Sequence, residues 1–311
     1  MADLTRALME LKVGEVRSAE PMARHTSFRL GGPARAMVWP RGPAEAAALV
    51  DWLKSREPFF VLGRGSNLLV ADQGYDGVVV NLRKLPATLQ PAGAGLVVVS
   101  ASFPAARLAR EVRRFGLVGL EFLAGIPGSI GGAVAMNAGA HGSELGDFVQ
   151  EAWVTDGSPV ASLVHSQLGF GYRQSIFPAA GLLLSVSLRL PTGDTSAAAD
   201  LERSYLERRR ASQPWRWPSA GSVFRNPPGQ AAGRLIEGVG GKGRRQGGAE
   251  ISTVHANFIV NRGGARAAEV LSLLRWAREA VEREYGIQMI PEIRLLGFAA
   301  PDLDWLPEVR L

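Results

Sequence analysis

The amino-acid sequence predicts an α+β fold with a large N-terminal region and a smaller C-terminal domain. Runs of Val, Ile and Leu alternate with amphipathic stretches along the 311 residues, which favours a mixture of strands and helices. A turn-rich, weakly apolar stretch at residues 191–200 predicts a linker, and we place the domain boundary near residue 195. The chain is 46% apolar and 21% charged, as expected of a globular protein with a buried core.

The N-terminal region is predicted to begin with one helix and several strands. Residues 43–55 have an apolar face at helical spacing and predict a short helix. Residues 59–63 predict a buried strand that ends in a loop at residues 64–67. Residues 77–82 and 95–101 contain β-branched runs and predict two further strands.

A second helix and three more strands are predicted to complete this region. Residues 104–116 predict a helix that Gly116 ends, because glycine readily adopts the left-handed conformation found after helix C-termini. Residues 151–156, 160–165 and 181–190 predict strands of an α+β layer.

The C-terminal domain is predicted to combine helices with two strands. A helix follows the linker to about Arg210, and residues 255–261 and 292–297 predict strands. The clearest helix covers residues 265–285 and is ended by Gly286. Its expected apolar face consists of Val270, Leu274, Ala277, Val281 and Tyr285. From the tail beyond residue 297 we expect only packing on the surface.

Charge and residue usage narrow the function classes. The formal net charge is +6, but the basic residues are scattered, which fits small-anion sites better than a continuous nucleic-acid surface. The absence of cysteine excludes disulfides, thiolate metal sites and cysteine nucleophiles. The four histidines lie far apart without metal-ligand spacing, so we predict no metal site.

Targeting and membrane signals are not expected from the sequence. The residues before Gly14 carry several charges and do not form a signal peptide. Residues 122–143 are uncharged and long enough for a spanning helix, but Ile126-Pro127-Gly128 would break that helix. We therefore expect a cytoplasmic protein that does not insert into a membrane.

Two glycine-rich loops suggest a large ligand. The first contains Gly63, Gly65, Ser66 and Asn67, and in the second, "GIPGSIGG", four glycines surround Ser129. Such loops can direct several backbone N–H groups at one anion because glycine leaves no side chain in the way, although ordinary tight turns have the same composition. The second loop continues into a stretch of small apolar residues. Together the loops favour a ligand with a phosphate part and a flat apolar part.

Polar residues along the chain add two further hints. Five of the six asparagines lie in the segments singled out here, which suggests specific polar contacts in addition to turn preference. Arg173, Ser222 and Glu292 could together stabilise an oxyanion and move a proton. Their spacing alone does not bring these three residues together. Residues 238–243, "GVGGKG", match a dinucleotide-binding pattern but follow a predicted helix rather than a strand, which argues against a Rossmann site.

Seven ordered segments together resemble the UDP-N-acetylenolpyruvoylglucosamine reductase family, in its compact second type. The resemblance covers about residues 20–297, and its segments are "HTSFRLGGPA", "LGRGSNLLV", "EFLAGIPGSIGGAVAMNAGAHGSE", "FGYRQSIF", "PSAGSVFRNP", "GRLIEGVGGKGRRQGGAEISTVHANFIVN" and "PEIRLLG". It implies the FAD-binding fold of the vanillyl-alcohol-oxidase type, with two α+β subdomains at residues 1–85 and 86–195. It also implies an α+β substrate-binding domain at residues 196–311.

The resemblance implies a role for each matching residue. Arg173, Ser222 and Glu292 match the family's catalytic arginine, its proton donor and its assisting acid. Tyr172, Asn226, Arg210 and Lys242 are expected to bind substrate, Asn226 at its diphosphate. The residues expected to bind FAD are Gly63, Arg64, Gly65, Ser66, Asn67, Leu68, Gly125, Ile126, Pro127, Gly128, Ser129, Gly131, Gly132, Asn137, Gly139 and Ala140.

The implied reaction belongs to peptidoglycan precursor synthesis, and so to cell-wall growth and division. NADPH would reduce the flavin, and the reduced flavin would pass hydride to the enolpyruvyl ether of UDP-N-acetylglucosamine. We expect a monomer that binds neither nucleic acid nor membrane. Two alternatives stay open on the residues alone. One is a flavoprotein oxidase of the same fold, and the other is a nucleotide- or RNA-binding module that uses "GGKGRRQGG".

Overall fold

The computed structural model describes residues 2–157, 159–177, 179 and 181–306. The chain forms two compact units, each assembled from separate stretches of sequence. Unit 1 contains residues 1–18, 36–64 and 77–209, and unit 2 contains residues 19–35, 65–76 and 210–311. The division into parts at residues 85 and 195 stays a prediction.

Runs of consecutive strands are separated by helices along the chain. The helices are α1 (Ala2–Glu10), α2 (Pro43–Leu53), α3 (Ala105–Arg113), α4 (Ile130–Ala135), α5 (Thr195–Ser212), α6 (Ala232–Gly238) and α7 (Ala267–Tyr285). The strands are β1 (Glu15–Pro21), β2 (Pro33–Trp39), β3 (Phe59–Leu62), β4 (Leu68–Val70), β5 (Tyr75–Asn81), β6 (Leu89–Gly93), β7 (Leu96–Ser100), β8 (Gly139–Ala140), β9 (Ser143–Glu144), β10 (Val149–Thr155), β11 (Ala161–Val164), β12 (Leu182–Arg189), β13 (Arg245–Gln246), β14 (Ala249–Ile251), β15 (Ile259–Asn261) and β16 (Arg294–Leu296).

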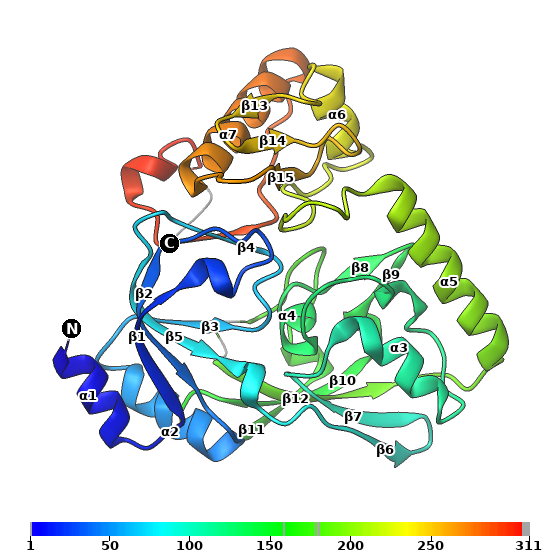
Figure 1. Cartoon of the computed structure of the whole chain (residues 1–311). Coiled ribbons are helices and arrows are strands. Elements are labelled where there is room, and N and C mark those ends of the chain that lie inside the picture. Colours follow the sequence, from blue (N-terminus) through cyan, green and yellow to red (C-terminus); the bar gives the residue numbers. More distant parts are fainter. Residues whose placement is uncertain (1, 158, 178, 180, 307–311) are drawn as a thin grey trace. The chain divides into compact units, whose positions relative to one another are not determined.

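The larger sheet of unit 1 is antiparallel and has the order β11-β10-β12-β7-β6. Val97, Val99 and Val186 point from this sheet into a core that Leu108 and Val112 of α3 also enter. Helix α4 contacts β12 and β7, and α3 and α4 can be followed beside this sheet in Figure 1. The strands predicted at residues 95–101, 151–156, 160–165 and 181–190 are therefore confirmed.

The second sheet has the order β1-β2-β5-β3, and β3 pairs in parallel with β5. Two parallel strands must be joined by a connection that crosses from the end of one strand to the start of the other. Residues 63–74 form this connection between β3 and β5. Leu49 and Leu53 of α2 pack with Val78 and Val80 of β5 in a separate apolar cluster. The predicted helix at residues 43–55 and the predicted strand at residues 59–63 are confirmed.

Helix α5 begins earlier than the sequence suggested. Residues 191–200 predicted a linker, but the helix starts at Thr195 because Asp194 Oδ1 accepts hydrogen bonds from the N–H groups of Ser196 and Ala197. Only the first four residues of the predicted linker lie outside the helix, so most of that prediction was wrong.

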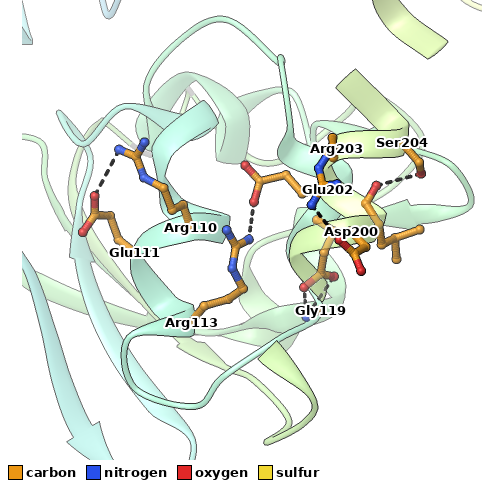
Figure 2. A network of polar contacts seen from close by, with 10 residues as sticks. Arg110, Glu111, Arg113, Gly119, Asp200, Glu202, Arg203 and Ser204 are labelled. Carbon is orange, nitrogen blue, oxygen red and sulfur yellow. Dashed lines mark hydrogen bonds and ion pairs between the residues drawn. The ribbon is translucent and has the colours of Figure 1, made fainter. Parts of the chain in front are cut away.

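Two contacts hold α5 within unit 1. Arg113 of α3 forms an ion pair with Glu202, and both side chains are mostly buried; Figure 2 shows this pair between the two helices. Tyr205 stacks flat on His141, with ring centroids 3.7 Å apart and an interplanar angle of 4°. Helix α5 is thereby attached to the small hairpin β8–β9.

Unit 2 is built around the antiparallel sheet β13-β14-β15. Helix α7 packs on β13 and β14 with α6 beside it, as Figure 1 shows. Val270, Leu274, Ala277 and Val281 are buried as predicted, whereas Tyr285 is exposed, so its placement on the apolar face was wrong. Asp72 accepts hydrogen bonds from the N–H groups of Ala267 and Ala268 and caps the start of α7.

The strand and tail predictions for unit 2 need two corrections. The strand predicted at residues 255–261 covers only Ile259–Asn261, and the predicted closing strand is β16, which pairs in parallel with β4. The tail does not simply lie on the surface, because Phe298, Leu303 and Leu306 are buried in the core of unit 2. Residues 307–311 of the tail lie outside the described residues. Within the described part of the chain, no helix combines the length and the apolar character needed to cross a membrane.

Candidate functional site

The first glycine-rich loop meets the second at Gly63, and this contact lies within unit 1. Gly63 lies so close to Ser129 that a Cβ at position 63 would be 2.6 Å from Ser129 Oγ. Gly131 packs equally tightly, since a Cβ there would be 2.9 Å from the Cβ of Ala101. Ser129 itself is buried. These positions therefore accept only glycine without a shift of their neighbours.

The segment beyond α4 forms the hairpin β8–β9. Gly139 pairs with Glu144, and Ala140 pairs with Ser143. The two turn residues, His141 and Gly142, have φ of 56° and 85°, as a type I′ turn requires. A Cβ on Gly139 would lie 2.6 Å from the carbonyl oxygen of Ser143 and 3.2 Å from Arg173 Nη1.

Arg173 is held against this hairpin by its side chain and by its backbone. Its Nη2 donates a hydrogen bond of 2.8 Å to the carbonyl oxygen of Gly139, and its guanidinium lies over the ring of Tyr172. Gly171 and Gln174 exchange two backbone hydrogen bonds, so Tyr172 and Arg173 form a tight two-residue turn. Arg173 has a φ of 56°, a conformation that non-glycine residues rarely adopt.

Asn137 connects this turn to the hairpin. Its Nδ2 donates to Glu144 Oε2 at 2.7 Å and to the carbonyl oxygen of Gly171 at 3.0 Å. Its Oδ1 accepts a hydrogen bond from the N–H of Gly146 at 2.8 Å. The side chain of Asn137 is buried and is used within unit 1, so a flavin contact from this side chain stays a prediction.

Ser222 and Glu292 come together in unit 2. Glu292 donates its N–H to the carbonyl oxygen of Val223, and Phe224 pairs with Pro291 in an antiparallel bridge. Ser222 itself pairs with Phe258. Two of the three predicted catalytic residues therefore lie on adjacent backbone segments of unit 2, whereas Arg173 belongs to unit 1.

Asparagine side chains fix the segment that carries Ser222. Asn257 Oδ1 accepts from the N–H of Phe224 at 3.0 Å, and its Nδ2 donates to the Phe224 carbonyl at 2.8 Å. Asn67 Nδ2 donates to the carbonyl oxygen of Glu292 at 3.0 Å. The asparagine side chains thus make specific polar contacts, those of Asn67 and Asn257 with the chain's own backbone and those of Asn137 also with the Glu144 carboxylate.

The residues predicted to bind substrate differ in their exposure and in the groups that they contact. Asn226 Oδ1 accepts from the N–H of Ala232 at the start of α6. Lys242 Nζ lies 2.8 Å from Glu237, so its charge already faces a carboxylate. Tyr172, Arg210 and Asn226 are exposed. Substrate contacts from all four predicted residues stay predictions.

The predicted flavin loop at residues 63–68 is divided between the units. Gly63 and Arg64 belong to unit 1, and Gly65, Ser66, Asn67 and Leu68 belong to unit 2. Gly65 has a φ of 63°, and its carbonyl oxygen accepts from the N–H of Ser27. The other residues expected at FAD lie in unit 1, around α4 and the hairpin; these are Gly125, Ile126, Pro127, Gly128, Ser129, Gly131, Gly132, Asn137, Gly139 and Ala140.

The residues of unit 1 fit a large flat cofactor with a diphosphate. Gly63 and Gly131 are positions where a Cβ would collide with neighbouring atoms, so backbone is the only possible surface there. Gly125 and Gly128 have φ of 72° and 125°, which lets this loop turn its N–H groups in directions closed to other residues. Among the described residues, His, Asp and Glu form no group of three that could hold a metal ion.

Comparison with known proteins first defines the class. Residues 34–158 match the profile of an FAD binding domain. Residues 213–296 match the UDP-N-acetylenolpyruvoylglucosamine reductase C-terminal domain. The chain is therefore an FAD-dependent oxidoreductase with an FAD-binding domain followed by a second domain, and the predicted α+β fold class is confirmed.

The chain belongs to the UDP-N-acetylenolpyruvoylglucosamine reductase family. It is 42% identical over 303 residues to the reductase of Halalkalibacterium halodurans, covering 96% of this chain and 99% of that protein. It is 43% identical over 300 residues to the reductase of Moorella thermoacetica, covering 95% and 99%. The crystal structure of the Thermus caldophilus reductase has a TM-score of 0.76 and 37% identity, covering 91% of this chain and 98% of that one.

Sequence reasoning passed over two residues of this region. Glu144 was seen only as the end of an uncharged stretch, and Asn257 only as one of several asparagines. In the structure Glu144 faces Arg173, and Asn257 holds the segment that carries Ser222. The sequence did contain a signal for Glu144, because it is the charged residue that directly follows a long uncharged segment.

Proposed function

We propose that the chain reduces the enolpyruvyl ether of UDP-N-acetylglucosamine to UDP-N-acetylmuramate with electrons from NADPH. The observation that carries this proposal is the family membership. The resemblance of the sequence segments implies that Arg173, Ser222 and Glu292 are the catalytic residues. FAD, when bound, relays hydride from NADPH to the methylene carbon of the enol ether.

Arg173 is proposed to stabilise the negative charge that develops when hydride reaches the methylene carbon. The electron pair of the C=C bond then moves to the neighbouring carbon and into the attached carboxylate. A guanidinium presents donors in a planar fork that suits two carboxylate oxygens. The bond from Arg173 to the Gly139 carbonyl and its αL backbone favour one orientation of this fork. Such a preorganised donor needs no rearrangement during the reaction.

Ser222 is proposed to give its hydroxyl proton to the carbon next to the carboxylate, which completes reduction to the lactyl ether. An alcohol is a weak acid, so its proton must be replaced quickly by a neighbouring group. Glu292 is the proposed source of that proton. Its N–H donates to the carbonyl oxygen of Val223, the residue after Ser222. The two hydrogen bonds between the Asn257 side chain and the backbone of Phe224 would keep the Ser222 hydroxyl in place during the transfer.

The substrate's diphosphate is proposed to bind basic and polar groups of unit 2. Asn226, Arg210 and Lys242 are the proposed partners, and Tyr172 is proposed to contact the substrate through its exposed ring. Lys242 would exchange its ion pair with Glu237 for an ion pair with the substrate diphosphate. A cytoplasmic location and a monomeric state belong to the same proposal.

Half-reactions test this function directly. Anaerobic NADPH should bleach the flavin absorbance at ~450 nm, and the enolpyruvyl nucleotide should restore it. A purified protein that is colourless and cannot be reconstituted with FAD would contradict the proposal. So would a flavin that NADPH reduces but the enolpyruvyl nucleotide does not reoxidise.

Ser222→Ala separates the two halves of the reaction. Reduction by NADPH should stay near the wild-type rate, whereas reoxidation by the nucleotide should slow by about 10²–10⁴-fold, the range expected for a lost general acid. Ser272→Ala on α7 is a matched control, because that hydroxyl is exposed and bonds only locally to the carbonyl of Ala268. Equal loss in both half-reactions would refute the role of Ser222 as proton donor.

A further inference from the structure

Glu144 stands next to the arginine on which the proposed function depends. Its Oε1 lies 3.7 Å from Arg173 Nη1, and the two side chains are 31% and 18% exposed. Glu144 is also the strand partner of Gly139, whose carbonyl oxygen accepts from Arg173 Nη2. A single short hairpin thus presents a carboxylate to one terminal nitrogen of the guanidinium and a carbonyl to the other.

The carboxylate of Glu144 is itself held in place. Its second oxygen, Oε2, accepts the 2.7 Å hydrogen bond from Asn137 Nδ2. The same Asn137 side chain reaches the carbonyl of Gly171, two residues before Arg173, and accepts from the N–H of Gly146, two residues after Glu144. Asn137 is 2% exposed, so this connection is shielded from water.

Arg173 requires such support because its backbone is strained. A non-glycine residue in the left-handed region persists only where its surroundings impose that conformation. The two backbone hydrogen bonds between Gly171 and Gln174 hold the turn. Contacts from Gly139, Asn137 and Glu144 help to hold the guanidinium. Charge adds a second constraint, since a carboxylate beside the guanidinium opposes the binding of any anion to Arg173.

We propose that Glu144, fixed by Asn137, is a positioning residue that sets the orientation of the Arg173 guanidinium for the reduction step. It does not touch the reacting atoms and acts only through Arg173. The carboxylate therefore improves the geometry at Arg173 while it weakens the attraction of Arg173 for the anionic substrate. This inference rests on the catalytic role proposed for Arg173.

The test variant is Glu144→Gln, which keeps the size of the side chain and an oxygen for Asn137 but removes the charge. Single-turnover reoxidation of the reduced flavin, measured against nucleotide concentration, separates the limiting rate from the apparent Kd. We expect the limiting rate to fall about 10- to 100-fold, since a displaced catalytic group costs rates of this order. The apparent Kd should stay equal or fall, because the opposing charge is gone. A merely structural role would weaken substrate binding and slow both half-reactions.

A double-mutant cycle with Arg173→Ala separates this inference from the proposed function. If Glu144 acts through Arg173, Glu144→Gln should change the rate by less than about twofold in the Arg173→Ala background. Full additivity of the two changes would overturn the inference and leave the role of Arg173 intact. An unchanged reoxidation rate in Arg173→Ala alone would instead overturn the catalytic role of Arg173, and the inference with it.

Two further variants keep the test decisive. Glu111→Gln is the matched control, because Glu111 of α3 is another carboxylate that forms ion pairs with arginines. Figure 2 shows Glu111 next to Arg110. This variant should leave both half-reactions unchanged. If Glu144→Gln does not fold, Glu144→Asp keeps the charge but shortens its reach to Asn137 and Arg173, and the same slower limiting rate is expected. A wild-type limiting rate in either folded Glu144 variant would overturn the proposal.

Discussion

Replacing Gly63 by Ala tests whether Gly63 and Ser129, one from each glycine-rich loop, pack as closely as the structure shows. The new Cβ would lie 2.6 Å from Ser129 Oγ, and the next nearest atom is Ser129 Cβ at 3.9 Å. Gly63 does not have a positive φ, so alanine meets no backbone penalty at this position. The whole cost of the substitution should therefore come from one oxygen atom.

The magnitude follows from the cost of overpacking. A methyl group forced into a filled space destabilises a protein by about 1–3 kcal/mol. A cost of about 2 kcal/mol would lower the Tm of a domain of 150–250 residues by roughly 4–8 °C. Because both loops are proposed to face the flavin, the affinity for FAD should also fall, by about tenfold or 1.4 kcal/mol.

The assay is thermal unfolding of the purified holoprotein, combined with FAD titration of the apoprotein. The double variant Gly63→Ala/Ser129→Ala is the decisive comparison, because it keeps the methyl group and removes the oxygen that it would meet. The double variant should be more stable than Gly63→Ala, with Ser129→Ala measured alone to complete the cycle. A Gly63→Ala protein as stable as wild type would refute this reasoning. So would a double variant no more stable than the single one.

Two other predictions concern unit 2. Burial lowers the pKa of His255, with Lys242 adding to the effect, and its Nδ1 accepts the N–H of Asn257, which requires a neutral ring. The folded pKa therefore lies below the unfolded value of about 6.5, so this contribution to stability is complete above pH 6.5 and is lost as the pH falls below it. Tm measured from pH 8 to 5 should show a smaller decline in His255→Gln, and an identical decline in both proteins would contradict the assignment. Gly286 ends α7 with a φ of 67° and open space around its Cβ position, so Gly286→Val should cost about 1–2 kcal/mol by urea unfolding and Gly286→Asn clearly less. Equal stability of the Val and Asn variants would show that backbone strain is not the cause.

Local patterns in the sequence predicted most of the α-helices and half of the strands, because these elements depend on nearby residues. Helix α7 shows this well, since its apolar spacing and Gly286 fix both its face and its end. The start of α5 was missed because Asp194 was taken as a turn residue, although Asp is also a strong N-cap. The pairing of strands was not predictable, since the residues in and around β4 do not indicate that its parallel neighbour is β16.

The candidate site was predictable in its residue types but not in its arrangement. Glycine composition and the family resemblance pointed to residues 122–144, yet neither revealed that Gly63 rests on Ser129. Glu144 and Asn257 escaped notice because they act on Arg173 and on the segment of Ser222 rather than on a ligand. Supporting residues of this kind are recognised by their distances, which a single sequence does not contain.

The pairing of β4 with β16 has a consequence for how the chain is made. Asn67 and Glu292, which join these segments, are 225 residues apart. At about 5–20 residues per second, a ribosome needs on the order of 10–45 s to travel that distance. Throughout this time Leu68, Leu69 and Val70, all buried in the finished protein, lack their strand partner. Unit 2 therefore cannot be completed until residues 294–296 have been translated, and chains that terminate before residue 294 are expected to aggregate through this open strand.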